Sequence, residues 1–317
     1  MKSHTYNATS NSDLFRVVDR EGNWQFYVLN PNTPEQVFLP GVTSVLGAGF
    51  AKGPRFYEYL KNGSKDQLEK TLQAAGERGD RVHQFVAMLL SGAKLDRFSK
   101  VADERGNPVE LSNDEWDCIL AFQEFWNRHD TALVAHEFAV YHIGKRASYA
   151  GTVDAVVRLR KECGNRYCSC KEFIGKVGLL DWKSSGGIYP DYGAQVAAYA
   201  SADNLPEVIG PRIVEYTGIV RIGTNHKSTG GYEFKPYNLQ ETAANLSKFE
   251  AAAELAGEYL PPFDPAKEIV EIPDTLSLVV TKDELAKPKP KPKKTPKKPA
   301  KGKTPKVATK TTTSTNA

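Results

Sequence analysis

The stretch "GLLDWKSS", residues 178–185, carries an apolar run directly into an acid and an amine. Side chains of a β-strand alternate between its two faces. A strand here therefore places Asp181 and Lys183 on the same face as Leu179, and Trp182 on the opposite face. The charged pair thus continues an apolar face at the point where the strand ends.

An acid and a lysine two residues apart are weak evidence by themselves. The chain holds a second such triplet, Glu233-Phe-Lys235, in another expected strand. A salt bridge across the edge of a sheet explains either triplet and contributes little to stability. The interpretation therefore depends on the residues that surround each triplet.

The segment "YAGTVDAVVRL", residues 149–159, holds a second acid that separates the two triplets. Asp154 interrupts an otherwise apolar strand three residues after Gly151. Neighbouring strands lie about 4.8 Å apart, so this carboxylate can approach Asp181. Two carboxylates that close repel each other unless one is protonated or a cation binds. With the Trp182 backbone carbonyl, they predict a site for Mg²⁺, which prefers oxygen ligands and keeps several waters.

Lys183 suggests what such a metal site does. A metal lowers the pKa of its bound water and neutralises charge that develops on a phosphate. A lysine beside it can hold or deprotonate that water, so the set suits phosphodiester hydrolysis. A nearby metal lowers the pKa of Lys183 and the acids raise it, and the sequence leaves the balance open. A carboxylate pair acting on a sugar is the alternative, and the lysine argues against it.

Four more residues are candidates with weaker support. Glu137, in "AHEFAVYH", begins the preceding strand, where an exposed strand residue is the alternative. Gln195 and Tyr199 lie four apart on an expected helix and share a face, which is also typical of a polar helix flank. His83 borders the apolar stripe of its helix, as a buried structural histidine does.

The order of the expected elements predicts a mixed α/β fold with a central sheet flanked by helices. Alternating residues around a turn predict a hairpin over residues 14–29. A short helix is expected to begin at Thr43 or Ser44, both good N-cap residues. The later elements are strands over 132–144, 149–160 and 176–183, a helix over 191–202, a hairpin over 212–223 and 231–237, and a helix over 239–260.

Two further helices precede the sheet. Residues 64–92 have a helical pattern that is expected to break at Gly76 and Gly79. Ser112 and Glu115 form a capping box that opens the next helix.

Six segments together resemble the RecB-like exonuclease family of the PD-(D/E)XK nuclease superfamily, over Val42–Tyr259. The phage exonucleases and the mitochondrial genome maintenance exonuclease are similar. No single segment is specific, but all six occur in the family's order. The segments are "GVTSVLG", "ERGDRVHQFV", "AHEFAVYH", "YAGTVDAVV", "LLDWKSS" and "QVAAYA".

The resemblance implies a restriction-endonuclease-like core and a metal-dependent DNA exonuclease that uses Mg²⁺ or Mn²⁺. It implies metal ligands at Asp154 and Asp181, with His83 as an added ligand. It further implies that Lys183 positions or activates the water and that Glu137 supports the site. Gln195 and Tyr199 would contact the substrate or order the site.

The cysteines depart from one branch of these nucleases. Some relatives bind an iron–sulfur cluster through three cysteines that follow the Gln-x-x-x-Tyr helix, but here no cysteine follows Cys170, so no such cluster is expected. Cys163, Cys168 and Cys170 lack the paired spacing of common metal sites. They are expected to be solvent-side cysteines in a hairpin loop.

The charge of the chain is concentrated in its tail. The formal net charge is +4, and the eleven lysines of residues 287–310 leave the rest at −7. This Lys/Pro-rich segment is expected to be disordered and to bind nucleic-acid phosphates, with a solubilising tail or a localisation signal as alternatives. The expected domains are a hairpin extension (1–41), a nuclease domain (42–275) and a linker with the tail (276–317).

Composition narrows the remaining classes. No apolar run approaches the length of a membrane helix, and the first residues lack the apolar core of a secretory signal. The expected location is the cytoplasm, of a host cell if the protein is viral, and the expected partner is single- or double-stranded DNA ends. The alternatives to an exonuclease are a structure-specific endonuclease and a non-catalytic nucleic-acid-binding protein on a nuclease-like fold.

Overall fold

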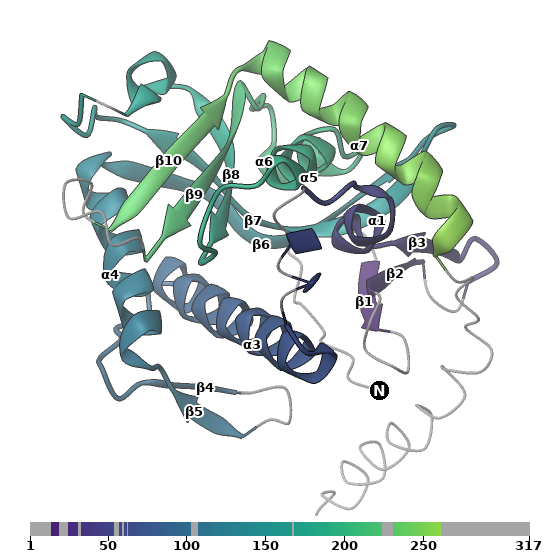
Figure 1. Cartoon of the computed structure of the whole chain (residues 1–317). Helices are drawn as coiled ribbons and strands as arrows, with labels where there is room; N and C mark the ends of the chain where they lie inside the picture. Colours follow the sequence, from purple (N-terminus) through teal and green to yellow (C-terminus); the bar gives the residue numbers. More distant parts are fainter. Residues whose placement is uncertain are drawn as a thin grey trace, which may run out of the picture. The chain divides into compact units, whose positions relative to one another are not determined.

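A five-stranded mixed sheet forms the centre of the computed structural model (Figure 1). Its strand order is β10-β9-β8-β7-β6, and only β8 and β9 are parallel. Parallel neighbours need a crossover, and here helices α5 and α6 provide it. The expected mixed α/β fold is therefore confirmed. The bounds are β6 (Thr131–Ile143), β7 (Ser148–Leu159), β8 (Val177–Lys183), β9 (Tyr216–Ile222), β10 (Tyr232–Tyr237), α5 (Pro190–Ala200) and α6 (Leu205–Ile209).

The structure describes most of the chain between residues 14 and 260. The described ranges are 14–18, 25–30, 33–53, 57–58, 60–61, 63–102, 107–166, 168–223 and 231–260. Contacts divide the chain into two units, Met1–Glu268 and Ile269–Ala317. The boundaries expected at 41/42 and 275/276 do not coincide with this division. The predictions for the Lys/Pro-rich tail fall outside the described residues.

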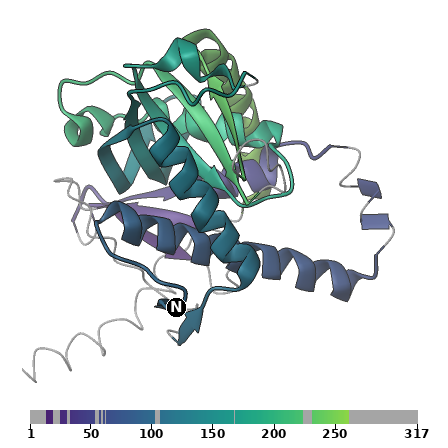
Figure 2. The same ribbon diagram turned by 90° about the vertical axis from the view of Figure 1, so that its left-hand side faces the viewer.

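Helices cover both faces of the sheet (Figures 1 and 2). Helices α1 (Val42–Gly49), α5 and α7 (Leu239–Tyr259) share an apolar cluster with Leu179 of β8. Helices α3 (Lys65–Leu90) and α4 (Asn113–Arg128) share a second cluster with Trp182, whose ring meets Phe122 edge-on at 4.9 Å. Leu179 and Trp182 thus lie on opposite faces, as the alternation of strand side chains predicts.

The hairpin expected at the N-terminus is confirmed and gains a third strand. Strands β1 (Leu14–Val18), β2 (Gln25–Leu29) and β3 (Val37–Pro40) form a separate antiparallel sheet. Tyr27 and Leu39 pack in one apolar cluster with Ala139 and Ala150 of the central sheet. Residues 14–40 are therefore packed into the same unit as the site described below.

Two helix predictions are wrong in detail. Helix α1 begins at Val42 with Gly41 as its N-cap, because Ser44 uses its hydroxyl elsewhere. That hydroxyl accepts from the backbone N–H of Gln25 (2.7 Å) and donates to its carbonyl (3.0 Å), which fixes the helix to β2.

Helix α3 does not break at its glycines. It continues through Gly76 and Gly79, each of which costs about 1 kcal/mol relative to alanine. Burial of Phe85 and Val86, at 0% and 1% exposure, stabilises the helix and outweighs this local preference.

The short elements agree with the remaining local signals. The capping box at Ser112 and Glu115 is present, and a second one opens α7 at Asn238 and Glu241. Strands β4 (Lys100–Ala102) and β5 (Pro108–Glu110) form a small hairpin, and η1 (Ser169–Phe173) precedes β8. Within the described ranges, no helix has the length and apolar character needed to cross a membrane.

The interpretation of the cysteines as solvent-side residues is wrong for Cys170. This residue is 2% exposed and packs in the same cluster as Phe173, because the turn of η1 directs both side chains toward the α4 side of the sheet. Cys163 and Cys168 are half-buried against that cluster.

Candidate active site

The candidate site lies where strands β7 and β8 separate. Their backbone pairing ends at Ala155 and Leu180. Beyond this point the N–H of Trp182 donates to the Asp154 carboxylate, Oδ2, at 2.8 Å. A carboxylate thus replaces the backbone acceptor that a continued β7 ladder would offer. Asp154 and Asp181, predicted from sequence to approach each other, both lie at this opening and are 7% and 1% exposed.

Asp181 is held by the helix that follows its strand. Its Oδ1 accepts a hydrogen bond from Gln195 Nε2 at 3.0 Å. The same amide nitrogen donates to the Tyr199 hydroxyl at 3.1 Å. The prediction that Gln195 and Tyr199 share a face of one helix is confirmed, and their contacts order the carboxylate.

Lys183 contacts the other oxygen of Asp181. Its Nζ lies 2.7 Å from Asp181 Oδ2 in an ion pair. The approach lacks hydrogen-bond geometry, so the described residues give this buried oxygen no hydrogen bond. Nζ also lies 5.0 Å from the ring centroid of Tyr192 on α5, and the lysine side chain is 17% exposed. The amine therefore sits at the mouth of the site.

His83 and Glu137 complete the cluster around Asp154. His83 Nδ1 lies 3.3 Å from Asp154 Oδ1. Ligand atoms of His83, Glu137 and Asp154 all lie within 4.8 Å of one another. One metal ion can contact three atoms at this spacing. The side chains come from α3, β6 and β7, so the tertiary fold assembles the set.

Glu137 lies in the middle of β6 rather than at its start, which corrects the sequence prediction. Its φ of 48° is left-handed, although the residues on both sides pair regularly with β7. A residue other than glycine rarely adopts this conformation, and such strain concentrates at functional sites. The conformation places the Glu137 carboxylate beside Asp154 instead of in the normal alternation of the strand.

The four charged groups shift one another's pKa. Burial, together with the charge on Asp154, raises the pKa of Asp181 to about 6. Burial opposes ionisation of Asp154 too, but the charge and hydrogen bond of His83 lower the pKa of that carboxyl below its usual value. Burial would lower the pKa of His83, but Asp154 outweighs it and raises this pKa to about 9. The pKa of Lys183 is likewise raised, because Asp181 and Asp154 outweigh its burial. Two buried acids are thus balanced by two cationic side chains.

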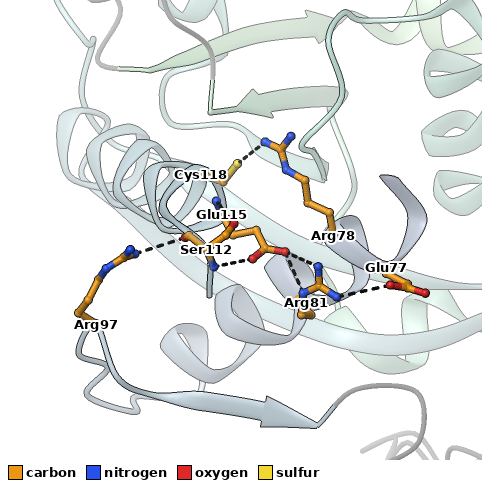
Figure 3. Close-up of polar contacts among 7 residues, drawn as sticks. All are labelled: Glu77, Arg78, Arg81, Arg97, Ser112, Glu115 and Cys118. Atoms are coloured by element: carbon orange, nitrogen blue, oxygen red, sulfur yellow. Dashed lines mark hydrogen bonds and ion pairs between the residues drawn. The ribbon is translucent and has the colours of Figure 1, made fainter. Parts of the chain in front are cut away.

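A second layer of contacts fixes the helix that carries His83 (Figure 3). Arg81, two residues earlier, donates to Glu115 Oε1 of α4 through Nε at 2.8 Å and NH2 at 2.7 Å. Glu115 Oε2 accepts from the Ser112 N–H at 2.7 Å in the capping box. Arg78 donates to Cys118 Sγ at 3.4 Å. These contacts dock α3 against α4 and hold His83 toward Asp154.

The second acid-x-lysine triplet has no such surroundings. Glu233 is the cross-strand neighbour of Arg221, and its Oε2 lies 2.6 Å from the Arg221 NH2. The Glu233 side chain is 49% exposed. This triplet therefore forms the sheet-edge ion pair that the sequence offered as the alternative.

Sequence reasoning missed Tyr192 and the role of Gly151. Tyr192 lies three residues before Gln195 on α5, a spacing that places both on the same side of the helix. A Cβ at position 151 would lie 2.4 Å from Cε1 of Tyr199, so only glycine lets that ring pack against β7. The glycine three residues before Asp154 was the available signal.

Replacing Gly151 with alanine is expected to lower the free energy of unfolding by about 1–3 kcal/mol, as overpacking in a core does. Tyr199 is 3% exposed and has no space to retreat. The matched control is Gly257→Ala on α7, where a Cβ meets no atom within 4 Å. There alanine is expected to stabilise by up to about 1 kcal/mol. Urea unfolding of both variants measures the difference, and equal stabilities would contradict the packing described.

Comparisons with known proteins do not assign the chain to a family. No protein-family model matches it, and no curated protein is significantly similar to it in sequence. The resemblance to RecB-like nucleases therefore stays a prediction from the residues themselves.

Proposed function

We propose that this chain is a divalent-metal-dependent DNA nuclease that acts as an exonuclease of the RecB-like type. The observation that carries the proposal is the cluster of His83, Glu137 and Asp154 ligand atoms within 4.8 Å, beside the ion pair of Asp181 and Lys183. Buried carboxylates this close favour a bound cation. The sugar-hydrolase alternative gains no support, because one acid is already paired with a lysine.

The donor set fits Mg²⁺ or Mn²⁺. Carboxylate oxygens of Asp154, Asp181 and Glu137 are the ligands these ions prefer, and the imidazole of His83 suits Mn²⁺. Asp181 Oδ2 has no hydrogen bond from the described residues, which leaves lone pairs for a ligand. The N–H and C=O of one strand residue point to the same side, so the predicted ligand, the Trp182 carbonyl, faces the same side as the N–H that contacts Asp154.

The side chains divide the work of hydrolysis. When bound, the metal would lower the pKa of a coordinated water and neutralise charge on the scissile phosphate. Lys183 is protonated at neutral pH because its pKa is raised, so it donates hydrogen bonds that orient the water or a phosphate oxygen. Gln195 and Tyr199 keep the Asp181 carboxylate in place. His83 exchanges its proton for the metal.

The test is cleavage of linear single- and double-stranded DNA, labelled at the 5′ or the 3′ end, with Mg²⁺, Mn²⁺ or EDTA. We expect progressive release of mononucleotides or short oligonucleotides from one end, with metal only. The label released first gives the polarity. Cleavage of closed circular DNA would support the endonuclease instead.

The non-catalytic alternative makes different predictions in the same assay. It predicts intact DNA and binding that is lost when residues 287–317 are deleted. Each lysine–phosphate contact steepens the dependence of log K on log [salt] by about 0.9 on duplex DNA. An unchanged salt slope after deletion would contradict a role of the tail under either function.

Metal affinity is expected to rise with pH by about tenfold per unit between pH 6 and 8, because binding displaces one proton. His83, with a pKa of about 9, carries that proton in the metal-free protein throughout this range. Below about pH 6 the proton on Asp181 adds a second one. Calorimetric titration with Mn²⁺ measures the dependence. His83→Gln should flatten it, and a wild-type affinity independent of pH would contradict His83 as a ligand.

A further inference from the structure

A second cluster of metal-ligating side chains lies at the other end of strands β7 and β8. It comprises His129, Cys163, Cys168 and Cys170, whose ligand atoms all lie within 4.8 Å of one another. His129 is the C-cap of α4, and the cysteines belong to the connection between β7 and β8. That connection leaves β7 at Leu159, five residues or about 17 Å along the strand from Asp154. The cluster is therefore separate from the candidate nuclease site.

The His129 side chain is aimed into this cluster with one nitrogen unused. It is 0% exposed, and its Nδ1 lies 2.9 Å from the Phe125 carbonyl oxygen. A carbonyl only accepts hydrogen bonds, so Nδ1 carries the proton and Nε2 carries a lone pair. Nε2 is buried and makes no hydrogen bond. An unsatisfied buried acceptor costs about 1–3 kcal/mol, and a ligand on Nε2 removes that cost.

The sulfur spacing fits one tetrahedral ion. Cys163 Sγ and Cys170 Sγ lie 3.6 Å apart, well beyond the ~2.05 Å of a disulfide, and all three cysteines are free. Zinc–sulfur bonds of about 2.3 Å give a tetrahedron with edges of about 3.8 Å. A cluster of several iron atoms would need its sulfurs farther apart. Three thiolates and one imidazole are a common ligand set of structural zinc sites.

The backbone around the cluster is already organised. The His129 carbonyl accepts from the N–H groups of Arg160 and Lys161, at 3.0 and 2.9 Å. These bonds hold the first residues after β7 against the end of α4. The Phe125, Tyr232 and Phe234 rings pack around the His129 imidazole, with centroids 4.5 to 5.9 Å away. A histidine fixed by a carbonyl and covered by aromatic rings is the usual surrounding of a metal ligand.

We propose that His129, Cys163, Cys168 and Cys170 bind one zinc ion that ties the β7–β8 connection to the end of α4. The site is structural, because four protein ligands leave no open position for a substrate. The sequence concealed it, because the fourth ligand lies 34 residues before Cys163 and no CxxC pair is present. This proposal does not depend on the proposed nuclease activity.

The test measures metal in the untagged full-length protein after dialysis against EDTA-treated buffer. Elemental analysis should find about one zinc per chain, and Co²⁺ put in its place should give the visible bands of tetrahedral cobalt–thiolate. Cys168→Ala, at a half-buried position, should reduce the zinc content at least tenfold and remove those bands. Cys118→Ser, a buried cysteine outside the cluster, and Asp154→Asn, in the other site, should each keep the zinc.

Two outcomes would overturn the zinc site. One is a wild-type protein with no retained zinc or with iron in its place. The other is undiminished zinc in both Cys168→Ala and His129→Gln. If either variant fails to fold, a mercurial thiol reagent added to the wild type decides. It should release one zinc as the three cysteines react, and the reaction of three thiols without zinc release would overturn the proposal.

Discussion

Replacing Asp181 with asparagine is expected to reduce metal-dependent DNA cleavage on the order of a thousandfold, because a metal site supplies several kcal/mol of transition-state stabilisation. Asparagine keeps the size of the side chain but removes the charge that pairs with Lys183 and faces the metal. Single-turnover cleavage of end-labelled DNA at saturating Mn²⁺ measures the effect. The fold should survive, because burial disfavours this carboxylate, as its pKa of about 6 indicates.

Glu233→Gln is the matched control for that variant. It removes the acid of the other acid-x-lysine triplet, whose carboxylate is half exposed and pairs with Arg221. Cleavage by this variant should stay within about twofold of the wild type, because a surface ion pair contributes at most about 1 kcal/mol, and to stability rather than catalysis. Equal losses in both variants, or more than a tenth of normal activity in Asp181→Asn, would refute the assignment of Asp181.

Replacing Glu115 with alanine is expected to lower the free energy of unfolding by about 3 kcal/mol, which is typical when one partner of a buried ion pair is removed. The Glu115 side chain is 3% exposed and contacts both Arg81 and the Ser112 N–H. Its loss leaves the Arg81 guanidinium, 21% exposed, without its carboxylate and opens the first turn of α4. Urea unfolding followed by circular dichroism gives the value.

The matched control for Glu115 is Glu110→Ala. Glu110 also pairs with a basic residue, Lys100, but both side chains are 50% exposed. Its replacement should cost less than about 1 kcal/mol. A loss in Glu115→Ala no larger than in Glu110→Ala would contradict the docking of α3 on α4 through this pair.

The sequence was sufficient where local rules decide the structure. Alternation along β8 placed Asp181 with Leu179 and opposite Trp182, and the capping box placed the start of α4. The spacing of Gln195 and Tyr199 placed both on one helix face. In each case the prediction needed only neighbours within a few residues.

The sequence was not sufficient where distant segments determine the geometry. The left-handed conformation of Glu137 arises in the pairing of β6 with β7, and no local pattern announces it. The position of His129 beside three cysteines depends on how α4 ends against the β7–β8 connection. The continuity of α3 through Gly76 depends on burial further along the helix, which overrides the local preference of glycine.

Anomalous scattering from crystals soaked in Mn²⁺ tests the central claim most directly. The account predicts a manganese peak bonded to the carboxylates of Asp154 and Asp181, with His83 or Glu137 as a further ligand. The peak should be absent from Asp154→Asn crystals soaked in the same way. Manganese bound only elsewhere, in crystals of a protein that cleaves DNA with Mn²⁺, would contradict it.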